Sequence, residues 1–319
     1  MTEWIRWGNE RVSITVCLKK CPSYGMVRDV LPDMLERAGL FEGRNLCGQS
    51  ILVKPNLLRA LPLACTEPGV VAALCAWLKD NGSKVKVADS PGFGTASGVA
   101  RAIGLDRALA PLGIAVEPMG PGRVVPLACG SRIRISQTAL DADAIISVAR
   151  VKAHSQMRLT LSCKNLYGCV PSLFKALYHT REGNEPEHFA RMQADILRAL
   201  PPAAAVADGI VAMHVTGPAH GQPFELGLLG VSDSPVALDE AIVLALGKRL
   251  HDIPLQRAFL QAGHPESAAG SQQKIFPFLK PEDFLPEGFV LPDHLLHTSF
   301  RPLRLVKSCL KRLWLEHFA

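Results

Sequence analysis

The chain has 319 residues, enough for one large domain or two small ones with a substantial buried core. Hydrophobic residues make up 48% and charged residues 20%, as in an ordinary globular protein. The net charge is +6, and residues 301–319 hold five basic and one acidic side chain, so the rest is close to neutral. With no basic stripe interleaved with aromatics, this balance argues against a nucleic-acid partner.

Cysteine usage and the N-terminus bear on the cellular location. Nine cysteines are scattered with no CxxC pair, so the chain contains neither a ferredoxin-type cluster motif nor a zinc ribbon. The first residues carry charges where a signal peptide needs an apolar core, and no apolar run is long enough to span a bilayer. We therefore expect a reduced, soluble, cytoplasmic protein and no metal site.

The first half of the chain alternates short apolar strands with helices. Strands are predicted at 12–18, 50–53, 84–89 and 144–149, and helices at 26–40, 66–81 and 99–112. Pro55 should end the second strand and leave Lys54 and Asn56 at the sheet edge. Thr66 is a candidate helix cap, with Pro68 in the first turn. The short links favour parallel βαβ units.

A glycine-rich turn follows the strand at 84–89. Gly92, Gly94 and Gly98 miss the spacing of a dinucleotide fingerprint by one residue, so a nicotinamide site is not expected. A helix beginning near Thr95 would point its amides at the turn, where an anion could bind. Short β-like pieces between 114 and 135 then indicate an irregular insertion.

The second half continues with mixed elements. We predict a helical turn at 174–178, a polar loop at 179–184, a helix at 186–200, strands at 203–207 and 226–231, and a helix ending at 250. The predicted fold is α/β, a mostly parallel, Rossmann-like three-layer sheet with an irregular β-containing insertion and a C-terminal helix. Residues 1–300 would form a single α/β domain, and 301–319 a basic amphipathic helix. That helix is expected to dock on its own domain, with contact to an anionic membrane surface as the alternative.

One stretch, 151–171, gathers most of the polar chemistry. Lys152 and His154 follow the strand at 144–149, and ligands of open α/β sheets bind at the carboxyl ends of strands. Lysines with asparagines suit a carboxylate or phosphate, and histidines are the natural acid–base groups. The alternative is that these are solvated loop charges and a structural histidine. As catalytic candidates we select His154, Lys152, Lys164 and His179, and as substrate-binding candidates Lys54, Asn56, Asn165, Asp89 and Asp208.

Other candidates have weaker support. Asp239 is more easily read as a helix cap, and Asp89 and Asp208 are equally open to that reading. Cys163 and Cys169 are more typical of buried structural thiols than of a nucleophile. His214 and His220 could hold a metal together with Asp208, but loop histidines of this kind are usually just exposed.

Several segments together resemble the domain-of-unknown-function 362 family, over roughly 12–250. They are ILVKPN at 51–56, residues 66–74 and 87–92, VKAH at 151–154, TLSCKNLYG at 160–168, residues 207–209 and TGPAHGQP at 216–223. The resemblance implies an α/β protein of presumed redox association, because some members are fused to ferredoxin-like iron–sulfur modules. This chain lacks such a module, so a partner would have to supply a cluster. The arrangement is also loosely similar to the amino-terminal domain of nickel-pincer lactate racemases, a likeness of fold only.

Three functions follow as hypotheses. The first is an oxidoreductase acting on a small anionic organic substrate in a lysine- and histidine-lined cleft, with a flavin or a separate ferredoxin-like electron donor. The second is a non-redox racemase, isomerase or lyase that moves a proton beside a carboxylate, with a histidine or lysine as base. The third is a ligand- or metal-binding protein without catalysis.

Overall fold

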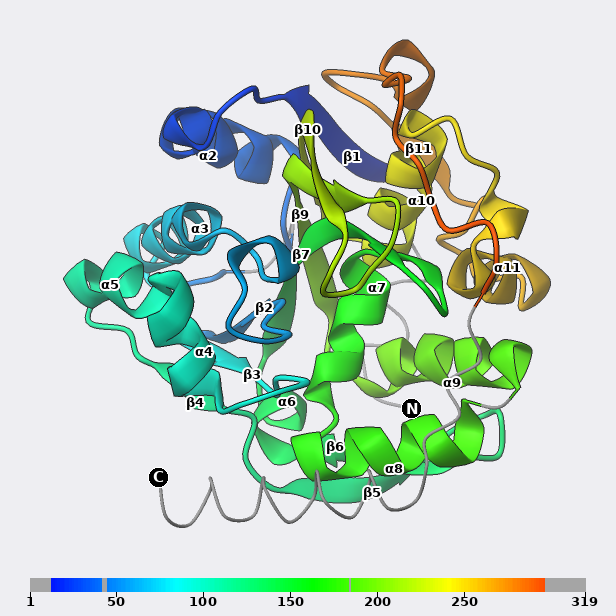
Figure 1. Cartoon of the computed structure of the whole chain (residues 1–319). Coiled ribbons are helices and arrows are strands. Elements are labelled where there is room, and N and C mark those ends of the chain that lie inside the picture. The colour runs from blue at the N-terminus through cyan, green and yellow to red at the C-terminus, as the bar shows by residue number, and fades with distance from the viewer. Residues whose placement is uncertain (1–12, 42–44, 184, 296–319) are drawn as a thin grey trace.

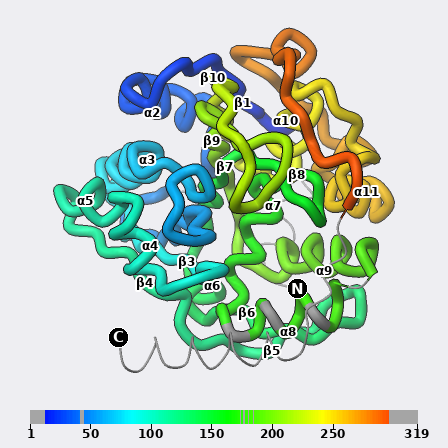
Figure 2. Tube along the Cα trace, in the orientation of Figure 1, coloured from blue at the N-terminus to red at the C-terminus, as the bar shows by residue number. Residues whose placement is uncertain are grey.

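The computed structural model describes residues 13–41, 45–183 and 185–295. Its centre is a nine-stranded sheet in the order β11-β1-β10-β9-β7-β2-β3-β4, with β8 paired to β7 (Figures 1 and 2). The strands are β1 (Ser13–Lys20), β2 (Ser50–Pro55), β3 (Lys84–Asp89), β4 (Val116–Pro118), β7 (Ala144–His154), β8 (Arg158–Thr160), β9 (Ala203–His214), β10 (Gln222–Ser232) and β11 (Gln273–Ile275).

The middle of this sheet is parallel. Strands β4, β3, β2, β7 and β9 run in one direction, while β10 pairs antiparallel with both β9 and β1. Parallel strands bury both faces, which explains why their sequences are apolar runs. The predicted mostly parallel α/β fold is therefore confirmed.

Helices cover both faces and form the outer layers (Figure 1). One face carries α2 (Val27–Arg37), α3 (Pro68–Asp80), α4 (Ala96–Ile103) and α5 (Leu105–Leu109). The other carries α7 (Ser162–Asn165), α9 (Pro186–Ala199), α10 (Pro235–Ala245) and α11 (Pro254–Gln261). Side chains along β2 point alternately to the two faces of the sheet. Ile51 and Val53 therefore pack in the core on one face, and Leu52 packs in the core on the other.

The remaining elements are short. Of the insertion predicted at 114–135, the first piece is β4 at the edge of the main sheet. The rest is a separate two-stranded antiparallel sheet of β5 (Gly122–Pro126) and β6 (Arg132–Ser136), followed by α6 (Gln137–Leu140). Helix α8 (Ser172–Glu182) lies beside α9. Single 3-10 turns are η1 (Tyr24–Met26), η2 (Pro62–Ala64), η3 (Ala110–Leu112), η4 (Leu166–Cys169), η5 (Leu250–Asp252) and η6 (Pro281–Asp283).

The structure corrects several predicted boundaries. Strand β7 continues past Ala149 to His154, because β8 pairs with its carboxyl-terminal part. Strand β9 likewise runs beyond Ala207 to His214, paired with β10. The predicted polar loop at 179–184 is helical up to Glu182. Thr66 does not cap α3, since its hydroxyl donates to the Val148 carbonyl.

Within the described residues, no helix is long and apolar enough to cross a bilayer. Residues 301–319, the predicted amphipathic tail, lie outside the described part of the chain.

Candidate functional site

A cavity of about 450 Å³ opens where β2, β3 and β7 end and β8 begins. The predicted site residues that line it are Lys54, Asn56, Asp89, Lys152, His154, Lys164, Asn165 and His179. Lys54, Asn56, Asp89, Lys152 and His154 converge because the carboxyl ends of parallel strands meet at one edge of a sheet. Lys164 and Asn165 come from α7, and His179 comes from α8. Asp208 is the predicted residue that does not line this cavity.

Lys54 lines the cavity, and its ammonium is fully engaged by protein partners. Its ammonium contacts the Asp89 carboxylate at 2.7 Å and donates to the Pro55 carbonyl at 2.8 Å and the Asn165 side-chain oxygen at 2.9 Å. An ammonium has three N–H donors, so all are taken. Asp89 also accepts from the backbone amides of Leu57 and Ser90 at 2.7 Å each. Lys54 and Asp89 thus position neighbouring groups and leave no free charge for a ligand.

Asn165 connects this pair to the rest of the site. Its oxygen accepts from Lys54 and from the Asn56 amide at 2.9 Å, and its nitrogen donates to the Ser147 hydroxyl at 3.0 Å and the Lys54 carbonyl at 3.1 Å. Because the Lys54 ammonium can only donate, the orientation of the Asn165 amide is fixed. The orientation of Asn56 follows, with its nitrogen toward Asn165 and its oxygen left without a partner among the described residues.

Gly168 allows the η4 backbone to approach the Lys54–Asp89 pair. A Cβ at this position would lie 2.1 Å from Lys54 Cε, 2.3 Å from Lys54 Nζ and 2.6 Å from Asp89 Oδ1. Real side chains do not tolerate such distances, so the absence of a side chain at Gly168 is a condition for the ion pair.

Lys152, His154 and Thr160 share one face of the β7–β8 ribbon. Lys152 and His154 are two residues apart on β7, and Thr160 is the antiparallel partner of Lys152. Lys152 donates to the Ala64 carbonyl at 2.6 Å and is almost completely buried. Burial, with the nearby charges of Lys164 and Arg150, lowers the pKa of Lys152 to about 7. A large fraction of this amine is uncharged at neutral pH.

His154 has a defined protonation pattern. Its Nδ1 accepts from the backbone amides of Gln156 at 3.1 Å and Met157 at 3.2 Å. Two donors at Nδ1 assign the remaining proton to Nε2. Burial, with the charge of Lys164, holds the pKa of His154 well below its usual range. His154 is thus a neutral imidazole that presents an N–H donor.

Lys164 projects from the short helix α7 and lines the cavity. In the described residues, no hydrogen bond or ion pair engages its ammonium. Desolvation and the charge of Lys54 lower the pKa of Lys164 to about 8. In most molecules the Lys164 side chain is therefore cationic at neutral pH, and its ammonium is free to bind an anion.

Helix α7 is anchored by Asp239 from α10. The two carboxylate oxygens accept from the backbone amides of Ser162 and Cys163 at 2.8 Å each, as in a helix N-cap. Asp239 was expected to cap its own helix, but the N-cap of α10 is Ser234, and Asp239 instead holds the first amides of α7. Burial raises the pKa of Asp239 to about 7, against the two amides that favour its charged form. The neighbouring Cys163 thiol has a pKa raised well above its usual value by burial, which fits a structural thiol.

His179 reaches the cavity from α8. Its ring packs against Tyr167 and Phe189, with centroid distances of 5.6 and 4.6 Å. Burial, with the charges of Lys164 and Lys175, lowers the pKa of His179 to about 3. It is thus a neutral ring in the cavity wall.

Asp208 belongs to a separate buried cluster. Its carboxylate contacts Arg150 at 3.2 Å and accepts from the Tyr24 hydroxyl at 3.0 Å and the Glu67 amide at 2.9 Å. Arg150 also donates to the Cys65 carbonyl at 2.6 Å. The cluster fastens the segment before α3 to the sheet, and this segment carries Ala64, the acceptor for Lys152.

Some lining residues were not expected from the sequence. They are chiefly Gln156, Thr160, Tyr167, Lys175, Ser90 and Arg59. Arg59 makes an exposed contact of 3.2 Å with His220. Thr160 lies inside the TLSCKNLYG segment, which was a usable signal. Gln156 lies in a turn between β7 and β8 whose existence the sequence did not reveal. Among the described residues, no group of three His, Cys, Asp or Glu side chains is placed to hold a metal.

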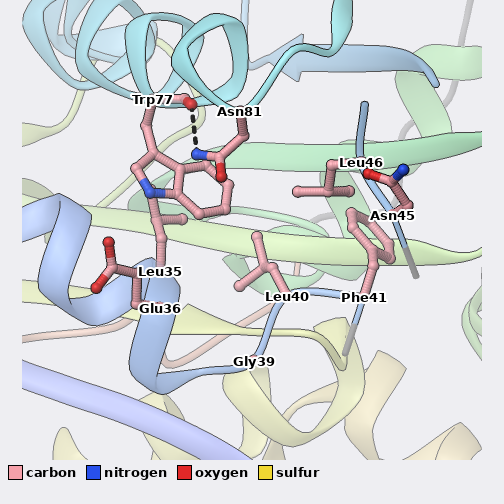
Figure 3. A pocket seen from close by; sticks show the side chains of 9 residues that line it. All are labelled: Leu35, Glu36, Gly39, Leu40, Phe41, Asn45, Leu46, Trp77 and Asn81. Carbon is pink, nitrogen blue, oxygen red and sulfur yellow. Dashed lines mark hydrogen bonds between the residues drawn. The ribbon is translucent and has the colours of Figure 1, made fainter. Parts of the chain in front are cut away.

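A second cavity, of about 300 Å³, lies between α2 and α3 (Figure 3). Leu35, Leu40, Phe41 and Trp77 line it together with the polar Asn45 and Asn81, and Asn81 donates to the Trp77 carbonyl. Glu36 is its ionisable lining residue. This cavity offers no set of groups for chemistry.

Fold and cavity together define an α/β protein with a lysine-rich cavity at the carboxyl edge of a parallel sheet. The chain belongs to the family described as Domain of unknown function (DUF362), whose model matches residues 51–243. A thylakoid-associated protein of Synechocystis sp. is 33% identical over 308 residues, covering 95% of each chain.

Two solved structures are partly similar to this chain. The lactate racemase apoprotein of Thermoanaerobacterium thermosaccharolyticum matches with a TM-score of 0.47 and 14% identity, over 74% of this chain and 58% of that one. A Thermotoga maritima protein matches with a TM-score of 0.39 and 12% identity, over 61% and 52%. This chain thus spans less than two thirds of either solved chain, and these likenesses concern the fold alone.

Proposed function

We propose that this protein is an enzyme that binds a small organic anion and moves a proton on the carbon beside its carboxylate. The observation that carries the proposal is the pairing, in one cavity, of a lysine amine with a pKa of about 7 and an unpartnered lysine ammonium with a pKa of about 8. A base works best when its pKa lies near the working pH, which fits Lys152. Lys164 supplies the charge that attracts the anion.

The proposed step is a proton abstraction. The Lys152 amine takes the proton, the C–H electron pair moves toward the carboxylate as an enolate, and a new N–H bond forms. The Lys164 ammonium and the His154 Nε2–H group would stabilise the growing negative charge on oxygen. Delivery of a proton to the opposite face of the enolate gives racemisation, and delivery to another atom gives isomerisation. Loss of a leaving group from the neighbouring carbon, with the enolate electron pair forming the new double bond, gives a lyase reaction.

Solvent isotope exchange tests this proposal. We would incubate malate, glycerate and gluconate with the protein in D₂O and follow loss of the proton beside the carboxylate by NMR. Exchange is expected with the wild type, and Lys152→Met should abolish it. Lys84→Met, at an exposed site on the amino end of β3, is the matched control and should leave exchange unchanged. Exchange that survives Lys152→Met would refute the assigned base.

The other functions enter as outcomes of the same test. Tight anion binding without exchange would support a binding protein. Oxidoreductase chemistry with a flavin or a ferredoxin-like donor, and the iron–sulfur association, stay predictions from the resemblance. A bound chromophore in the purified protein would support them. We retain a cytoplasmic location as a proposal, while the thylakoid association of the Synechocystis relative makes membrane attachment worth measuring.

A further inference from the structure

Three hydrogen-bonding oxygens in the wall of the cavity have no partner among the described residues. They are Asn56 Oδ1, Gln156 Oε1 and Thr160 Oγ1, and each is buried at the level of the atom. Gln156 is 2% exposed and Thr160 is 3% exposed. A buried polar atom without a partner is costly, at about 1–3 kcal/mol, so such atoms call for an explanation.

The two amide oxygens cannot be exchanged for nitrogens by turning the side chains. The orientation of Asn56 is set through Asn165 by the Lys54 ammonium. The Gln156 nitrogen donates to the Gly183 carbonyl at 3.3 Å, which leaves its oxygen as the free atom. Both side chains therefore offer acceptors, and a ligand must offer donors to meet them.

The charges of the cavity decide which donor fits. Its described cationic lining residues are Lys54, Lys164, Lys175 and Arg59, beside the Lys152 amine, and the one carboxylate among them, Asp89, is paired with Lys54. A ligand ammonium would meet positive charge with no free counter-charge. A hydroxyl group is a neutral donor, and it can also pair with the Thr160 hydroxyl in either direction.

We propose that the ligand of this cavity is a polyhydroxylated organic anion, of the sugar-acid or sugar-phosphate type. Its anionic head would lie at Lys164 and Lys152, and its hydroxyl groups would donate to Asn56, Gln156 and Thr160. The cavity volume of about 450 Å³ exceeds the needs of a two- or three-carbon acid. The inference rests on the anion-binding part of the proposed function and is independent of the proton transfer.

Calorimetric binding to the full chain tests the inference with two pairs of probes. Gluconate is compared with hexanoate, and glucose 6-phosphate with inorganic phosphate, so that the head group and the hydroxyl groups are judged separately. We expect at least one hydroxylated anion to bind about tenfold or more tightly than its plain counterpart, since sites built for hydroxyl groups reject analogues that lack them. The pair that shows the difference identifies the head as carboxylate or phosphate.

Variants connect the preference to the named atoms. Thr160→Val removes an unpartnered hydroxyl and should leave the melting temperature near that of the wild type while reducing the preference about three- to tenfold. Gln156→Met should act in the same direction. Gln193→Met is the matched control, because Gln193 is equally buried and both of its amide atoms lack a partner among the described residues, but it lies on α9 outside the cavity lining.

The outcomes separate the two proposals. Equal binding of hydroxylated and plain anions in both pairs, or a preference unchanged in both Thr160→Val and Gln156→Met, would overturn the inference. Selective binding of a hydroxylated anion without deuterium exchange would uphold it and count against the proton transfer. Deuterium exchange in acids that bind without any preference for hydroxyl groups would support the proton transfer and count against the hydroxylated ligand.

Discussion

Gly168 shows how a single residue sets the geometry of the site. Gly168→Ala would force its Cβ into Lys54 and Asp89 and should lower the free energy of unfolding by about 1–3 kcal/mol, as overpacking does. Anion binding should weaken with it, because Asn165 and Asn56 are oriented through Lys54. Chemical denaturation and calorimetry measure both effects.

Gly69→Ala is the control for this substitution. Gly69 lies in the first turn of α3, and its nearest neighbour to an added Cβ is 4.0 Å away. The Gly69→Ala variant should be as stable as the wild type or slightly more stable. Equal stability of Gly168→Ala and Gly69→Ala would show that the backbone does not press on the ion pair.

The lowered pKa of Lys152 predicts that the stability of the fold depends on pH. Burial lowers its pKa from 10.5 to about 7, so between these values the unfolded chain binds a proton that the folded chain does not. Stability from this group therefore rises with pH, by up to about 1.4 kcal/mol per unit, across that window. Relative to Lys152→Met, the wild type should gain stability between pH 7 and 9 in urea denaturation. A difference that stays flat or falls with pH would mean that Lys152 remains charged in the folded state.

At the scale of elements, the short helix α7 depends on its anchor in α10. Asp239→Asn turns one of the two acceptors into a donor that opposes a backbone amide, and should destabilise the protein by about 1–3 kcal/mol. Because α7 carries Lys164 and Asn165, anion affinity should also fall.

Asp80→Asn provides the comparison, since Asp80 is the exposed last residue of α3. Unfolding curves and anion titrations of the two variants should differ clearly. If Asp239→Asn binds anions as the wild type does, α7 does not need this cap to present Lys164.

Strand β7 marks the limit of what the sequence could predict. Its apolar first half and the convergence of Lys54, Lys152 and Asn165 followed from hydrophobic runs and from sheet geometry. Its polar second half was missed, because Arg150 looks like a strand end until Asp208 on β9 is known to neutralise it. Unpartnered atoms such as Gln156 Oε1 depend on distant neighbours, so no local pattern reveals them.

At the scale of the whole molecule, the parallel strands place the site residues at one edge of the sheet, and helices cover both of its faces. The cavity side chains come from segments as distant as Lys54 and His220. Apart from α7, η4 and α8, these segments are strand ends and loops supported by the buried sheet, an arrangement that combines rigid placement with access for a ligand.

The C-terminal tail yields a prediction for the whole chain, although it lies outside the described residues. Its apolar residues recur at helical spacing, which favours docking on the domain. Deleting residues 301–319 should therefore lower the melting temperature, because docking buries side chains worth about 1.5–3 kcal/mol each. An unchanged melting temperature with lost binding to anionic vesicles would instead establish the tail as a membrane contact.

The pH profile of deuterium exchange tests the central claim most directly. The proposal needs Lys152 as the free amine and Lys164 as the ammonium, with pKa values of about 7 and 8. The exchange rate should therefore rise as the pH passes 7, fall as it passes 8, and vanish in Lys152→Met at every pH. A profile without these limbs, or exchange that persists in Lys152→Met, would contradict the account.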